Sequence, residues 1–121
     1  MIVTRKIVEL SKGVACELLV TPALYGVAAR RGIDLTSDAN AGGQGVFVSY
    51  IKMMYCAAVN AWEVKAVDSP EMGAFPYKYS EFDAWAWEGP KRFIGVVTFM
   101  YEALTGRSLK EGAIEEKKKR K

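Results

Sequence analysis

The residues of this chain that could carry out acid–base chemistry are three carboxylates beside two tryptophans. Glu81, Asp83 and Glu88 lie close in the sequence to Trp85 and Trp87. In an enzyme that cleaves sugars, such carboxylates would act as acid and base, and the tryptophans would stack on the substrate. A structural role explains the first two carboxylates more simply, because the helix dipole stabilises negative charge in the first turn of a helix. We therefore expect these residues to be structural.

Other catalytic and ligand-binding chemistry finds little support in the sequence. The chain has no histidine, which is the commonest general acid or base and the commonest transition-metal ligand. Cys16 and Cys56 alone cannot form a four-ligand zinc site, and we expect both thiols to be reduced and buried. The Gly-Gly-Gln-Gly run at 42–45 lacks the lysine and hydroxyl residue that complete a phosphate-binding loop. We expect no catalytic centre, no cofactor and no metal ion.

The net charge of +3 is confined to the C-terminal end of the sequence. Residues 110–121 hold six basic and three acidic side chains, so residues 1–109 balance at eleven of each. A chain of this length suits a single core. We expect residues 1–109 to form one globular domain and residues 110–121 to form a basic, disordered tail.

The tail leaves a second function open, because its last residues are all basic. They are Lys117, Lys118, Lys119, Arg120 and Lys121. Such a cluster can contact phosphates through charge alone, in a manner that is salt-sensitive and blind to sequence. Because the rest of the chain is neutral, we do not expect nucleic acid to be the main partner. A nucleic-acid-associated accessory protein remains the alternative function.

No segment of the sequence has the length and polarity of a membrane span. The longest strongly apolar stretch, residues 53–62, lies between Lys52 and Glu63 and is shorter than the roughly 20 residues that cross a bilayer. Residues 1–6 lack the apolar core of a signal peptide. We expect a cytoplasmic protein with no membrane partner.

The N-terminal third of the sequence predicts a β-hairpin followed by a helix. Residues 2–10 and 14–20 are rich in β-branched residues and flank a short turn. Thr21 and Pro22 form a helix-start signal, with the threonine as the capping residue. Gly32 marks the end of that helix, and the Gly/Asp-rich residues 33–45 predict a loop.

The longest predicted helix spans residues 46–65, and its polar positions lie on one face. Those positions are Ser49, Lys52, Asn60 and Glu63, with Cys56 in the middle of the stripe. The other positions, which include Tyr50, Met54 and Trp62, are apolar over most of the helix circumference. A helix this apolar is either central in the fold or part of a subunit interface.

Two further helices are predicted in the second half of the chain. Ser80 and Asp83 resemble a capping box before a short helix at 81–88. Gly89-Pro90 separates it from a helix at 91–104, on which Ile94 is among the side chains expected to be buried. The fold class that follows is α+β, mostly α, with an N-terminal β-hairpin followed by a bundle of about four helices.

Aromatic residues are concentrated around the short helix. In a helix Phe82 and Trp85 share a face and Trp87 points away, so one tryptophan should be less buried than the other. An exposed tryptophan would favour a protein contact, whereas a buried one fills the core. The candidate protein-binding residues are Phe82, Trp85, Trp87, Tyr50, Met54 and Trp62.

Short segments in most of residues 1–109 resemble the tail assembly chaperones of long-tailed bacteriophages. The resemblance is carried by Thr-Pro-Ala-Leu (21–24), Gly-Ile-Asp-Leu (32–35), Tyr-Ser-Glu-Phe-Asp-Ala-Trp (79–85) and Ala-Leu-Thr-Gly (103–106). It implies a non-enzymatic protein that self-associates in the host cytoplasm. Its partners would be the tape-measure protein, which it keeps soluble, and the tail tube protein, which it helps to recruit.

Overall fold

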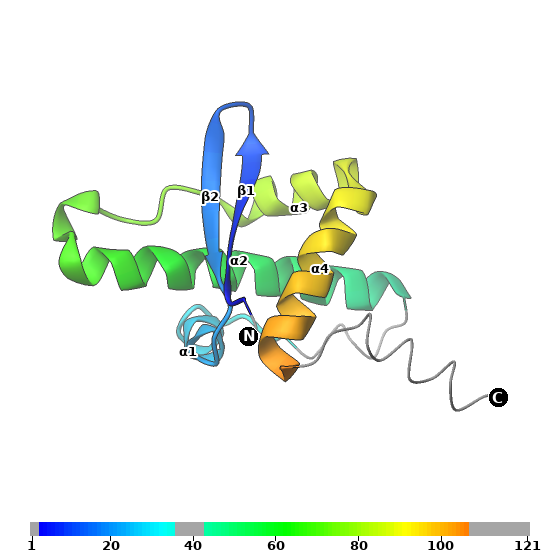
Figure 1. Cartoon of the computed structure of the whole chain (residues 1–121), viewed down its shortest axis with the longest axis horizontal. Helices are drawn as coiled ribbons and strands as arrows, with labels where there is room; N and C mark the ends of the chain where they lie inside the picture. The colour runs from blue at the N-terminus through cyan, green and yellow to red at the C-terminus, as the bar shows by residue number, and fades with distance from the viewer. Residues whose placement is uncertain (1–2, 36–42, 107–121) are drawn as a thin grey trace.

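The computed structural model describes residues 3–35 and 43–106, and in these residues a hairpin precedes four α-helices. The elements are β1 (Arg5–Ser11), β2 (Val14–Leu19), α1 (Ala23–Arg30), α2 (Gly43–Asp68), the short 3-10 helix η2 (Pro70–Met72), α3 (Tyr79–Glu88) and α4 (Pro90–Thr105). This order confirms the α+β, mostly α, fold class. In Figure 1 the hairpin and α4 both cross the long α2.

The hairpin packs one face on the helices and leaves the other exposed. Its antiparallel register pairs Val8 with Cys16, and both side chains are buried. The next pair, Ile7 with Glu17, lies on the opposite face, where Ile7 is exposed. The chain reverses at Gly13, whose φ of +77° lies in the left-handed region that glycine tolerates best.

Helix α2 lies at the centre of the fold, where β2, α1, α3 and α4 all contact it. Its buried side chains are Ser49, Ile51, Met54, Tyr55, Cys56, Ala57, Ala58, Val59, Asn60 and Ala61. Because other elements cover several sides of α2, its wide apolar circumference is explained within a single chain. The helix is longer than predicted at both ends and begins at Gly43, so residues 43–45 are helical instead of forming a loop.

The polar stripe predicted along α2 faces partly into the core. Ser49 and Asn60 are buried, and both side chains find partners there. The Ser49 hydroxyl donates to the Leu35 carbonyl. Asn60 Nδ2 donates to the Leu19 carbonyl at 2.9 Å and to Thr21 Oγ1 at 3.1 Å. These bonds join α2 to β2 and to the segment that enters α1, and they offset the cost of burying polar groups.

The predicted capping role of Thr21 is wrong. Helix α1 has Pro22 at its N-cap position, and no side chain hydrogen-bonds to its first turn. Thr21 instead accepts the hydrogen bond from Asn60. The predicted end of α1 is confirmed, because Gly32 has a φ of +68° and follows the last helical turn.

The start of α3 also differs from the prediction. The helix begins at Tyr79, two residues before the predicted start, so Ser80 lies inside it. Glu81 caps the helix by accepting from the Lys78 backbone N–H at 2.7 Å. Asp83 lies further along and accepts from the Trp87 indole N–H at 3.0 Å.

Helix α4 begins at Pro90 and ends at Thr105, and Gly106 follows it with a φ of +71°. Phe93, Val96 and Met100 turn into the core. The prediction that Ile94 is buried is wrong, because this side chain is 59% exposed. One residue along a helix is a rotation of roughly 100°, which takes Ile94 away from the face that holds Phe93. Among the residues that the structure describes, no helix is long and apolar enough to cross a membrane.

Candidate protein-binding surface

The structure separates the six candidate residues into core and surface positions. Phe82 and Met54 are fully buried, and Trp85 is 6% exposed. Tyr50 and Trp62 are partly buried. Trp87 is 45% exposed, which confirms the prediction that the two neighbouring tryptophans differ in burial. Trp87 is therefore the candidate with the most accessible aromatic surface.

Trp87 is held in one position by contacts from two helices. Its ring lies against that of Phe47 on α2, with ring centroids 4.3 Å apart. Its indole N–H donates to Asp83 Oδ1 at 3.0 Å, one helical turn earlier on α3. Phe47 in turn packs edge-on against the buried Phe93 of α4, at 4.8 Å between centroids. The exposed indole is thus fixed by a stack of rings that continues into the core.

The partly buried Phe47 of α2 and the exposed Trp87 of α3 contact one another, and we call these two residues the Trp87 surface. Val46, next to Phe47 on α2, and Ile94, next to Phe93 on α4, are also exposed apolar side chains. Of the Trp87 surface, only Trp87 was a candidate from the sequence. Phe47 was missed because its contact with Trp87 joins segments 40 residues apart, and no local pattern reports it.

Most of the remaining aromatic residues of the second half form part of the core. Tyr55 of α2 makes edge-on contacts with Phe75, Tyr79 and Phe82, at 5.5 to 5.8 Å between centroids. Such edge-on pairs stabilise beyond the area that they bury. The core role therefore accounts for Phe82, and the interface role remains available to Trp87.

Tyr50 and Trp62 both lie on α2, and both side chains are partly buried. Burial is the main cause that raises the pKa of Tyr50. The Trp62 indole N–H donates to the Gly73 carbonyl at 3.0 Å. Trp62 also lines a small cavity of about 100 Å³, to which Cys16 of β2 and Met72 of η2 contribute as well.

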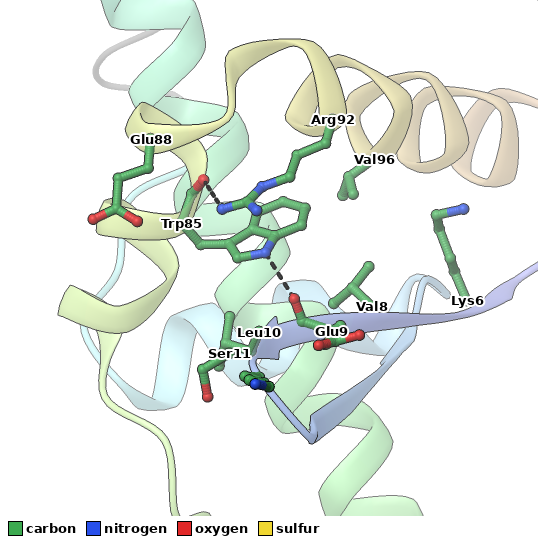
Figure 2. A pocket seen from close by; sticks show the side chains of 10 residues that line it. Lys6, Val8, Glu9, Leu10, Ser11, Trp85, Glu88, Arg92 and Val96 are labelled. Atoms are coloured by element: carbon green, nitrogen blue, oxygen red, sulfur yellow. Dashed lines mark hydrogen bonds between the residues drawn. The ribbon is translucent and has the colours of Figure 1, made fainter.

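A larger cleft, of about 730 Å³, lies between β1 and the corner where α3 meets α4 (Figure 2). Trp85 reaches across it, and its indole N–H donates to the Glu9 carbonyl at 2.9 Å. The Arg92 guanidinium lies over the Trp85 ring at 4.4 Å and donates to the Trp85 carbonyl at 3.0 Å. The other charged residues that line the cleft are Lys6, Lys12 and Glu88, with the Glu9 side chain.

Two of the three candidate carboxylates have structural roles and both thiols are buried, whereas Glu88 is exposed and lines the cleft. Glu81 caps α3, and Asp83 orients Trp87. Burial is the main cause that raises the pKa of the Cys16 and Cys56 thiols to about 11. At neutral pH only about one in 10⁴ of such thiols would be the nucleophilic thiolate. Within residues 3–35 and 43–106, no group of three or more cysteines and carboxylates is placed to hold a metal ion.

The basic candidates Lys117, Lys118, Lys119, Arg120 and Lys121 lie outside the described residues, as does the predicted tail at 110–121. No protein-family model, curated protein or solved structure matches the chain.

Proposed function

We propose that this chain is a non-enzymatic assembly chaperone that binds an apolar helical partner through the Trp87 surface. The observation that carries the proposal is a 45% exposed tryptophan whose ring and N–H are both held in place by the protein. Tryptophan is enriched among the residues that contribute most to protein–protein affinity. A pre-positioned side chain also loses less conformational freedom when a partner binds.

The form of the surface favours a helix as the ligand. Trp87 of α3 and Phe47 of α2 form an apolar contact between two helices, and Val46, next to Phe47 on α2, presents a further exposed apolar side chain. Helices commonly bind such surfaces by laying an apolar stripe across them. The sequence resemblance implies that the partner is a tape-measure protein, which several copies of this chain would coat and keep soluble in the cytoplasm while helping to recruit tail tube subunits.

The roles of the polar residues support a binding function over a catalytic one. Two of the three carboxylates beside the tryptophans, Glu81 and Asp83, cap a helix and orient an indole. Both cysteines are buried thiols with raised pKa values. The polar groups that are buried in the described residues are hydrogen-bonded, and none projects without a partner into a cavity.

The test compares partner binding by the intact chain and by Trp87→Ala. Removal of a central interface tryptophan costs about 2–4 kcal/mol, so the dissociation constant for a tape-measure fragment should rise about 30- to 1,000-fold. The matched control is Val67→Ala, which trims an 81% exposed apolar side chain at the other end of α2. Equal effects of the two changes, with circular dichroism unaltered, would show that the Trp87 surface is not the binding site.

The Asp83→Ala variant tests whether partner binding depends on the orientation of the Trp87 indole as well as on its presence. It leaves the Trp87 ring in place but removes the acceptor of its N–H. The dissociation constant should rise by a smaller factor, about 3- to 10-fold, because a hydrogen bond of this kind contributes about 1 kcal/mol. Binding that is as weak as in Trp87→Ala would mean that Asp83 itself contacts the partner.

A further inference from the structure

The outer edge of each strand of the hairpin is the side on which its backbone N–H and C=O groups point away from the other strand. The two outer edges differ in whether these groups are hydrogen-bonded to the rest of the fold. The Val20 N–H donates to the Thr4 carbonyl at 2.8 Å, which makes these two residues a hydrogen-bonded pair. Hydrogen-bonded and non-hydrogen-bonded pairs alternate along an antiparallel ladder. The observed register therefore turns the backbone groups of Arg5, Ile7 and Glu9 away from β2.

The outer edge of β2 is occupied by the rest of the fold. The Leu19 carbonyl accepts from Asn60 Nδ2 at 2.9 Å. The Ala15 carbonyl accepts from the Tyr77 hydroxyl at 3.5 Å. These contacts come from α2 and from the segment before α3, and they cover the edge at both of its ends. Another strand therefore cannot pair along β2.

The outer edge of β1 is occupied at one end only. The Glu9 carbonyl accepts from the Trp85 indole N–H at 2.9 Å. Within residues 3–35 and 43–106, no hydrogen bond reaches the outward N–H or C=O of Arg5 or Ile7. Arg5 is exposed, and the Ile7 side chain is 70% exposed. An unpaired strand edge of this kind is a template for a further strand.

The cleft beside β1 provides the chemistry that would select such a strand. Lys6 and Val8 of β1 line one side, and Arg92 and Val96 of α4 line the other (Figure 2). Within the described part of the chain, neither lysine that lines the cleft, Lys6 or Lys12, pairs with a carboxylate. Beside the open edge, the lining thus combines the apolar side chains of Val8 and Val96 with the positive charges of Lys6 and Arg92, and the carboxylates of Glu9 and Glu88 line the cleft as well.

Lys6 and Val8 lie two residues apart on the same face of β1. We propose that the outer edge of β1 binds an extended segment of another polypeptide that carries an acidic and an apolar side chain two residues apart, on the face that it turns to the cleft. The segment would hydrogen-bond to the backbone of Arg5 and Ile7. Its apolar side chain would contact Val8 and Val96, and its carboxylate would pair with Lys6. This mode of binding, in which main-chain bonds supply affinity and alternate side chains supply specificity, is strand addition. It uses a different surface from Trp87 and does not depend on the assembly-chaperone function.

The test uses a synthetic peptide, acetyl-(Glu-Thr-Val-Thr)₂-amide, which places Glu and Val on the same face of a strand. The control of equal composition is acetyl-(Glu-Val-Thr-Thr)₂-amide, which places them on opposite faces. Binding is measured by hydrogen exchange of the Ile7 amide in the full chain. At about 90% saturation with the first peptide, exchange at Ile7 should slow about tenfold, because only the free fraction exchanges. The control peptide at the same concentration should produce much less protection.

Two variants distinguish strand addition from contact with the side chains alone. Ile7→Pro removes the outward N–H and should abolish peptide binding, whereas Ile7→Thr keeps that N–H and should retain it. Lys6→Glu, which keeps the backbone intact, should weaken binding at least about tenfold and lose most of the salt dependence. Trp87→Ala should have no effect on the peptide.

Three results would overturn the proposal. One is unchanged exchange at Ile7 under saturating peptide. Another is equal binding by the Lys6→Glu variant and the intact chain. The third is protection of Ile7 that grows with protein concentration in the absence of peptide, since that result would assign the edge to a second copy of the chain.

Discussion

Replacement of Asn60 by alanine removes a side chain that hydrogen-bonds α2 to the hairpin. Asn60 is 3% exposed, and its Nδ2 donates to the Leu19 carbonyl and to the Thr21 hydroxyl. The Leu19 carbonyl lies on the edge of β2 and, among the described residues, takes its side-chain hydrogen bond from Asn60. The substitution therefore leaves a buried acceptor without a donor.

The expected loss of stability follows from these two bonds. An intramolecular hydrogen bond contributes about 1 kcal/mol net, and an acceptor left buried and unpaired costs about 1–3 kcal/mol. Thr21 is only partly buried, so its hydroxyl can bond to water and adds little. We expect the free energy of unfolding to fall by about 2–4 kcal/mol. For a chain of this size that corresponds to a Tm lower by about 8–20 °C.

The assay is urea denaturation followed by circular dichroism, with two companion variants. Thr21→Val removes one acceptor and should cost no more than about 1 kcal/mol. Asn60→Asp should cost more than Asn60→Ala at pH 7, because a carboxylate would face the Leu19 carbonyl. That penalty should shrink as the pH falls, because a protonated carboxyl can donate. A loss of less than about 0.5 kcal/mol for Asn60→Ala would refute the role given to this bond.

Three further predictions concern the thiols, the Glu17 ion pairs and the tail. Burial raises the pKa of the Cys16 and Cys56 thiols from 9.0 to about 11, so between pH 9 and 11 these thiols ionise in the unfolded chain before they do in the folded one. The free energy of unfolding should therefore decline as the pH rises from 9 to 11, and it should decline less in Cys16→Ala. Equal pH profiles of the two proteins would contradict this. Hydrogen bonds from Lys65 and Arg5 lower the pKa of Glu17 below 4.5. The stability that the charged Glu17 contributes should therefore be present above pH 4.5 and lost as the pH falls below it. Urea titrations should show this loss in the intact chain and not in Glu17→Gln. Removal of residues 115–121 should leave tape-measure binding nearly unchanged; retention of any nucleic-acid binding by the truncated chain would exclude the tail as its cause.

Local signals in the sequence were enough to predict the hairpin and the order of the helices. Gly32 and Gly106 end helices with positive φ, and Pro90 starts one, as their residue types predict. These signals act within one turn of the chain. They therefore report where an element ends better than they report what it packs against.

The side of each helix that faces the core was harder to predict, because it depends on residues far away in the sequence. Asn60 is polar and yet buried, since the Leu19 carbonyl on a β-strand edge needs a donor. Ile94 is apolar and yet exposed, because α4 turns Phe93 towards Phe47. Helical periodicity alone reveals neither the Leu19 carbonyl as the partner of Asn60 nor Phe47 as the partner of Phe93.

The candidate site shows the same division. The offset between Trp85 and Trp87 within one helix predicted correctly that their burial would differ. The identity of the buried one depends on the Glu9 carbonyl, which accepts from Trp85 across the cleft. The open edge of β1 could not be predicted, because hydrogen-bond pairing and its alternation require the register of the hairpin.

Co-expression with a long helical tape-measure protein tests the central claim most directly. The account predicts that the intact chain brings the tape-measure protein into the soluble fraction and co-purifies with it in several copies. Trp87→Ala should leave the tape-measure protein insoluble, and Val67→Ala should behave as the intact chain does. A tape-measure protein that stays insoluble with the intact chain, or that is equally soluble with Trp87→Ala, would contradict the account.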